Sequence, residues 1–147
     1  MKIKIKKLHP EAIIPKYATD GAACFDLHAV NPPDEMAMHG LPTVVPTGLS
    51  FEIPHGFVML IFSRSGHGFK HDTRLANCVG VIDSDYRGEV MVKLTRDYGN
   101  NTHLTIKEGD RIAQAMVLPI PVVELVEADE LTETERGAGG FGSTGVA

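Results

Sequence analysis

The chain has 147 residues, of which 43% are hydrophobic and 22% charged, values that fit one globular domain with one core. Its 19 acidic and 14 basic side chains give a net charge of −5. That balance argues against a general nucleic-acid or membrane-surface binder, because both need a basic field. A small anionic ligand is still compatible with it, since a few well-placed arginines can hold one.

The two cysteines, Cys24 and Cys78, have no metal or redox spacing, and we interpret them as small buried hydrophobes in a reducing compartment. The first ten residues, MKIKIKKLHP, contain no apolar run typical of a signal peptide. No stretch approaches the roughly 20 apolar residues of a membrane span. We therefore expect a cytoplasmic protein, either cellular or made by a virus in its host's cytoplasm.

Apolar residues recur with a period near two in short segments, which predicts β-strands. In chain order these segments are residues 2–6, 43–54, 56–62, 88–101 and 103–126, the last expected to form two or three strands. Nine prolines and 15 glycines divide the chain at intervals typical of an all-β barrel or sandwich. At most one short helix is expected, within residues 67–76.

The last part of the chain differs in composition from the rest. Residues 124–135, ELVEADELTETE, hold six carboxylates and no basic residue, and residues 136–145, RGAGGFGSTG, are half glycine. We expect a domain body over residues 1–123, followed over 124–147 by an acidic linker and a mobile glycine-rich C-terminal arm. The arm is either a slack tail or a flexible segment with a function.

Three loops between the predicted strands could carry chemistry. The first, SRSGHG at residues 63–68, offers Arg64 and two glycines to an anion, although an arginine in a surface turn is equally common. The second, residues 77–89, places Asp83 after two apolar residues, where a semi-buried carboxylate could act as a general base beside the flat ring of Tyr86. A polar turn is the more frequent interpretation of that stretch alone.

The third loop, residues 109–120, contains a turn and then a strand over 112–118 in which Gln114 is the odd polar residue. Its side chain either faces outward or makes a hydrogen bond in a site. His67 and His71 are four residues apart, and we interpret them as surface histidines rather than as metal ligands.

Taken in order, these loops resemble motifs of the trimeric dUTPase family, the deoxyuridine triphosphate nucleotidohydrolases. The five matching stretches are DGAACFDLHA (20–29), SRSGHG (63–68), GVIDSDYRGE (80–89), GDRIAQ (109–114) and RGAGGFGSTG (136–145). The resemblance spans nearly the whole chain, and the third and fifth stretches are its most specific parts. It implies an all-β subunit, a distorted jelly-roll-like β-barrel, in a homotrimer whose C-terminal arms are exchanged between subunits.

The same resemblance implies hydrolysis of dUTP to dUMP and pyrophosphate, which limits uracil incorporation into DNA and supplies dUMP for dTTP synthesis. Asp83 would activate the water that attacks the α-phosphorus. Mg²⁺ would be carried chiefly by the triphosphate, with Asp26 near it through water. No nucleic-acid or membrane partner is implied.

Substrate-binding roles carry over by position in the motifs. Tyr86 would pack under the deoxyribose, and Phe141 would stack on the uracil. The uracil edge would be read by Asn77, Gly80 and Met91. The phosphates would be held by Arg64, Ser65, Gly66, Gln114, Arg136, Gly142, Ser143 and Thr144.

Four residues depart from the family pattern. Cys24 and Phe25 are bulkier than the usual residues of the first motif, while Ser63 and His67 replace a proline and a leucine of the second. We expect Cys24 and Phe25 to alter the geometry on the phosphate side, and Ser63 and His67 to tune the site rather than remove it. Two alternative functions remain: a dCTP deaminase of the related fold, and a dUTPase-like binding module with hydrolysis lost or secondary.

Overall fold

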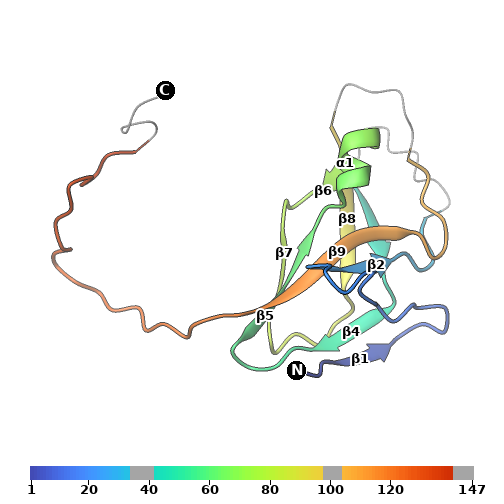
Figure 1. Ribbon diagram of the computed structural model, residues 1–147, viewed down its shortest axis with the longest axis horizontal. Coiled ribbons are helices and arrows are strands. Elements are labelled where there is room, and N and C mark those ends of the chain that lie inside the picture. The colour runs from blue at the N-terminus through green and yellow to red at the C-terminus, as the bar shows by residue number, and fades with distance from the viewer. Residues whose placement is uncertain (34–41, 98–103, 141–147) are drawn as a thin grey trace.

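The computed structural model describes residues 1–33, 42–97 and 104–140. Within these ranges it is mostly β-structure with a single short helix, as the all-β prediction required (Figure 1). The elements are β1 (Lys4–Lys7), β2 (Phe25–His28), β3 (Thr43–Pro46), β4 (Leu49–Glu52), β5 (Phe57–Phe62), α1 (Ser65–His71), β6 (Thr73–Leu75), β7 (Gly80–Ile82), β8 (Met91–Arg96) and β9 (Arg111–Pro119).

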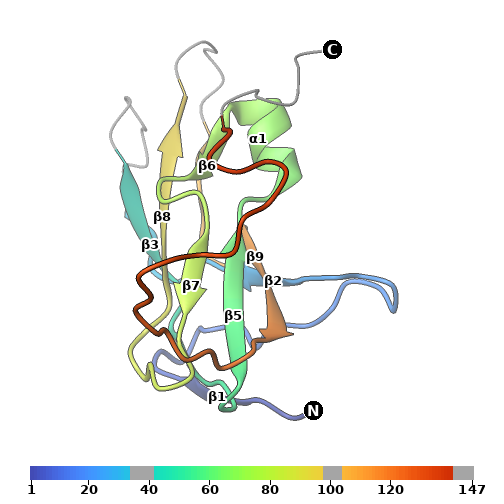
Figure 2. The same ribbon diagram turned by 90° about the vertical axis from the view of Figure 1, so that its left-hand side faces the viewer.

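The strands form three antiparallel sheets. The largest has the order β2-β9-β5-β7, the second β3-β8-β6, and β1 pairs with β4. Figure 2 shows β5 beside β9, whose ladder pairs Phe57–Phe62 with Gln114–Pro119. Strand β9 thus lies between β2 and β5, so it joins parts of the chain that are distant in sequence.

The sheets enclose one hydrophobic core. Along a strand, side chains point alternately to the two faces of the sheet, and those on one face are buried in the core. In β8, for example, Val92 and Leu94 are buried while Met91 and Lys93 are exposed. Leu27 on β2, like Leu94, is almost fully enclosed. Full burial of such a side chain stabilises the fold by about 1.5–3 kcal/mol. The predicted period of two therefore marks the residues whose burial stabilises the protein most.

Two predicted elements differ from the structure. The helix covers Ser65–His71 rather than part of 67–76 only, because Asp72 adopts the left-handed conformation (φ 49°) and ends it, and the next residues form β6. The run over 103–126 contains only one described strand, β9, instead of two or three. A turn with Gly109 at φ +77° precedes it, and both Pro119, its last residue, and Pro121 lack the N–H group that a ladder needs.

Residues 120–140 form no helix or strand and run away from the sheets (Figure 1). Their apolar side chains are exposed, Leu125 and Leu131 at 92% and 89%. This segment therefore has no packing partner within its own described chain, and the boundary at residue 123 stays a prediction. No helix in the described ranges is long and apolar enough to cross a membrane.

Candidate functional site

The register of the largest sheet brings three of the predicted motifs together. Asp26 on β2 lies opposite Gln114 on β9, and Gln114 lies opposite Phe62 at the end of β5. The loop that follows β5 carries Ser63 and Arg64. One row across three strands thus places an acid, an amide and a guanidinium group close together.

The centre of this row is an ion pair. Arg64 Nε donates to Asp26 Oδ1 at 3.0 Å, and Arg111 Nη1 lies 3.2 Å from Asp26 Oδ2. The side chains of Asp26 and Arg64 are only 17% and 23% exposed. Arg64 Nη1 also donates to the Arg111 carbonyl oxygen at 3.3 Å. The carboxylate therefore bridges two guanidinium groups and restricts the orientation of Arg64.

Gln114 uses its side chain in the site rather than facing outward. Its amide Nε2 donates to the Ser63 carbonyl oxygen at 2.9 Å, which ties β9 to the loop after β5. Both residues line a hollow together with Arg64, Ser65, Gly68, Phe69 and Asp72. A Cβ atom added at Gly66 would meet nothing within 4 Å, so the first turn of α1 has free space beside it. The hollow can admit an anion next to Arg64 and backbone N–H groups.

A second, smaller cavity of about 160 Å³ lies between β5, β7 and β8. Its lining includes three predicted base-reading residues, Asn77, Gly80 and Met91. A Cβ at Gly80 would come 3.1 Å from Ile61 Cβ, so a side chain at this position would require Ile61 to shift. The structure brings these residues together, and their role stays a prediction.

Asp83 and Tyr86 occupy the turn after β7. The Tyr86 N–H donates to the Asp83 carbonyl oxygen at 3.2 Å, and the Tyr86 hydroxyl donates to the Glu89 carbonyl oxygen at 2.9 Å. The ring lies over Gly88, where a Cβ would come 2.4 Å from the hydroxyl oxygen. The expected partial burial of Asp83 is wrong for the single chain: β7 is an edge strand, and Asp83 is exposed.

The tail residues are not gathered with the others. Arg136 is exposed, and its Nε donates to the Gly139 carbonyl oxygen at 2.9 Å, within the tail itself. The predicted ligands Phe141, Gly142, Ser143 and Thr144 lie outside the described residues. Within the described ranges no hydrogen bond or ion pair joins Arg136 or Asp83 to Arg64.

The departures from the family pattern have local explanations. Ser63 Oγ accepts the Leu75 N–H at 2.9 Å, so it links the loop to β6. The Phe25 ring stacks on Phe51 with centroids 6.5 Å apart, as part of the core. Burial, and then the nearby Asp26, raise the pKa of the Cys24 thiol.

The prediction of buried cysteines is wrong for Cys78. It is exposed, because it lies in the turn between β6 and β7 with φ +63°. Cys24 is partly buried, and both thiols are free.

Sequence reasoning missed Arg111 and misjudged His67. Arg111 sits at the start of β9, and its only sequence signal is a cation just before the apolar run that contains Gln114. His67 was expected at the surface, yet it is partly buried on α1 with Nε2 3.4 Å from Arg64 Nη1. Burial first, and then the charge of Arg64, lower the pKa of His67. His71 is also partly buried.

The side chains of the site offer few direct ligands to a divalent metal. The described residues contain no cluster of three or more His, Cys, Asp or Glu side chains that could hold an ion. Both oxygens of Asp26 already accept from arginines. These residues fit a hydrated Mg²⁺ that arrives on an anionic ligand, with Asp26 in contact through water.

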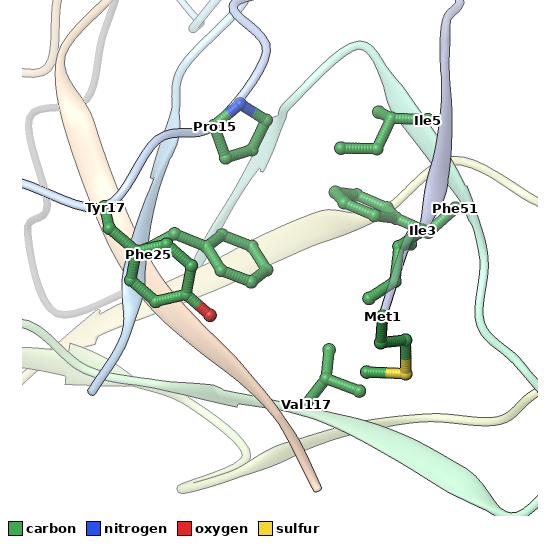
Figure 3. A pocket seen from close by; sticks show the side chains of 8 residues that line it. All are labelled: Met1, Ile3, Ile5, Pro15, Tyr17, Phe25, Phe51 and Val117. Carbon is green, nitrogen blue, oxygen red and sulfur yellow. The ribbon is translucent and has the colours of Figure 1, made fainter. Parts of the chain in front are cut away.

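A third hollow, of about 250 Å³, is lined mainly by apolar side chains (Figure 3). Its lining comes from the N-terminal segment and strands β2, β4 and β9, and consists of Met1, Ile3, Ile5, Pro15, Tyr17, Phe25, Phe51 and Val117. This hollow presents a hydrophobic surface and no catalytic groups.

Comparison with known proteins gives a consistent result. The family model described as dUTPase matches residues 10–145. A Nautilia profundicola protein named deoxyuridine 5'-triphosphate nucleotidohydrolase is 50% identical over 145 residues, 99% of each chain. A Helicobacter pylori protein of the same name is 42% identical over 147 residues, 100% of this chain and 99% of the other. A mutant of Staphylococcus bacteriophage 80alpha dUTPase, solved with dUpNHpp, superposes with a TM-score of 0.83 at 25% identity over 99% of both chains.

Proposed function

The chain belongs to the dUTPase family and is a dUTP diphosphatase, and we propose that it hydrolyses dUTP by water attack on the α-phosphorus with Asp83 as general base. The products are dUMP and pyrophosphate, so the reaction limits uracil incorporation into DNA and supplies dUMP for dTTP synthesis. The observation that carries the assignment of the phosphate site is the row of Asp26, Gln114 and Arg64 across β2, β9 and the loop after β5.

In this proposal the triphosphate lies in the hollow beside Arg64. Nε of Arg64 is held by Asp26 and Nη1 is held by the Arg111 carbonyl oxygen, while Nη2 makes no hydrogen bond within the described ranges. Nη2 is therefore available for a phosphate oxygen. Ser65, the backbone at Gly66 and the Gln114 amide would add further donors.

The nucleoside would enter the cavity lined by Asn77, Gly80 and Met91. The Asn77 amide and the backbone groups there would pair with the uracil edge and be left unpaired by the wrong base, which is the stronger form of discrimination. Tyr86 would pack under the deoxyribose and leave no room for a 2′-hydroxyl group. Its position over Gly88, held by the bond to Glu89, supports this role.

For the chemical step, Asp83 would take a proton from water as the water oxygen bonds to the α-phosphorus. The bond from that phosphorus to the bridging oxygen breaks, and pyrophosphate leaves with the electron pair. Bound Mg²⁺ would neutralise charge on the phosphates, and Asp26 would orient its water shell. The exposure of Asp83 in the single chain gives water access to the carboxylate.

We further propose a homotrimer with exchanged C-terminal arms. The apolar side chains of residues 120–131 have no partner in their own described chain, and the apolar hollow of Figure 3 could bury those of a second copy. The charges agree: the tail is acidic, whereas the segment around β1 carries Lys2, Lys4, Lys6 and Lys7. The arm beyond this contact would bring Arg136, Phe141, Gly142, Ser143 and Thr144 to a neighbour's site.

The test is pyrophosphate release by the purified protein with Mg²⁺ from dUTP, dTTP, dCTP and UTP at equal concentrations. We expect strong selectivity for dUTP. Ammonia release from dCTP would instead indicate a deaminase. No release from any nucleotide would contradict the hydrolytic function and favour a binding module.

A further inference from the structure

His67 stands one helical turn after Arg64 and contacts it directly. Nε2 of the imidazole lies 3.4 Å from Arg64 Nη1. We propose that neutral His67 is a positioning residue that holds Arg64 in its phosphate-binding orientation, and that protonated His67 releases it, so that nucleotide affinity falls in acid. This inference rests on the proposed role of Arg64, and it concerns a position where the family pattern has leucine.

The contact defines the state of the imidazole. A guanidinium group can only donate, so Nε2 of His67 must be the acceptor and the ring proton must sit on Nδ1. Nδ1 is buried and has no hydrogen-bond partner among the described residues. A second ring proton would therefore have to sit on Nε2, where it would face Arg64 rather than an acceptor.

The contact also completes the restraint on Arg64. Asp26 holds Nε, and Nη1 is shared between His67 and the Arg111 carbonyl oxygen. Two edges of the planar group are thus fixed, which sets the direction in which Nη2 points. If His67 became a cation, its Nε2–H would face the Nη1–H groups of Arg64. Nε2 would then no longer accept a hydrogen bond, and the two positive charges would repel each other.

The charged and titratable groups around His67 favour the neutral form. Arg64, Arg111 and His71 oppose protonation, while Asp110 alone favours it. With burial as the largest cause, they lower the pKa of His67 below its usual value of about 6.5. The coupling is reciprocal, so a proton on His67 must weaken the restraint on Arg64 by the same free energy.

The first experiment measures binding of non-hydrolysable dUpNHpp with Mg²⁺ to the wild type, His67→Gln and His67→Leu at pH 8.0 and 5.0. Glutamine supplies a neutral acceptor that does not titrate, and leucine is the family residue. At pH 8.0 we expect wild type and His67→Gln to agree within about twofold; at pH 5.0 we expect the wild type to bind severalfold more weakly than His67→Gln. Comparison at equal pH removes the titration of the nucleotide itself.

An equal pH dependence in the wild type and His67→Gln, or tighter wild-type binding in acid, would overturn the proposal. A second measurement needs no nucleotide: the imidazole of His67 is titrated by NMR in the wild type and in Arg64→Gln. We expect the pKa of His67 to rise in Arg64→Gln. An unchanged pKa would refute this inference alone, whereas a raised pKa in a protein that binds no nucleotide would refute the proposed function and leave the pairing of the two side chains intact.

Discussion

Arg64 and Asp26 are 38 positions apart in the chain, yet their side chains meet at 3.0 Å and join the loop after β5 to strand β2. The pair is mostly shielded from water, since neither side chain is more than a quarter exposed. An ion pair in such a place both stabilises the local structure and fixes the orientation of the arginine.

Removal of that carboxylate should destabilise the protein and weaken phosphate binding. Asp26→Asn leaves Arg64 and Arg111 without their shared counter-charge, and we expect a loss of about 1–3 kcal/mol in the free energy of unfolding, measured in urea. Glu52→Gln is the control, because the Lys4–Glu52 pair is fully at the surface and should contribute nothing measurable. Equal stability of Asp26→Asn and wild type would show that the Arg64–Asp26 ion pair does not stabilise the fold.

Asp83→Asn should bind nucleotide normally and lose turnover. The amide keeps the size of the side chain but cannot accept the proton of the attacking water, so kcat should fall by about 10²–10⁴-fold. Affinity for dUpNHpp and pyrophosphate release from dUTP are the two measurements. Asp85→Asn is a matched control in the same exposed turn. Near-normal turnover of Asp83→Asn would remove Asp83 from the mechanism.

Gly88→Ala should impair the discrimination between deoxyribose and ribose. Its new Cβ would come 2.4 Å from the Tyr86 hydroxyl oxygen, so the ring has to leave its position. We expect the ratio of kcat/KM for dUTP to that for UTP to fall about tenfold, within the range available to steric discrimination. Gly21→Ala is the control, since a Cβ there meets nothing within 4 Å. An unchanged ratio would mean that Tyr86 does not exclude the 2′-hydroxyl group.

Truncation before Arg136 should abolish efficient hydrolysis and leave a folded trimer. In the described residues Arg136 makes its side-chain hydrogen bond within the tail, so the body does not depend on it. Steady-state kinetics and sedimentation are the measurements, and removal of residues 146–147 alone is the control. A truncated enzyme with the full rate would show that the arm is a slack tail.

The stability of the protein should decrease in acid, partly through His67. Its folded-state pKa is lowered, so the unfolded chain binds a proton first as the pH falls. The contribution is complete above the unfolded value of about 6.5 and is lost progressively below it. Urea unfolding of wild type and His67→Leu at pH 7.5, 6.5 and 5.5 measures it. A variant with the same pH slope as the wild type would exclude His67 as the source.

Much of the local structure could be predicted from the sequence. The period of two identified β8, because one face of that strand is buried, and the short continuous apolar run FVMLIF identified β5, which lies between β9 and β7. The order of the five motifs pointed to the family, because each motif is a short continuous stretch. The sequence did not predict where α1 ends, because its end depends on the left-handed backbone conformation of Asp72 just before β6.

Only the tertiary structure decided how the motifs meet. The insertion of β9 between β2 and β5 brings Arg111 within 3.2 Å of Asp26 across 85 positions of sequence. The same packing makes His67 a neighbour of Arg64 and leaves Asp83 exposed in the turn after β7, an edge strand. No local pattern encodes these relations, because strand order and register depend on how all the apolar faces are buried at once.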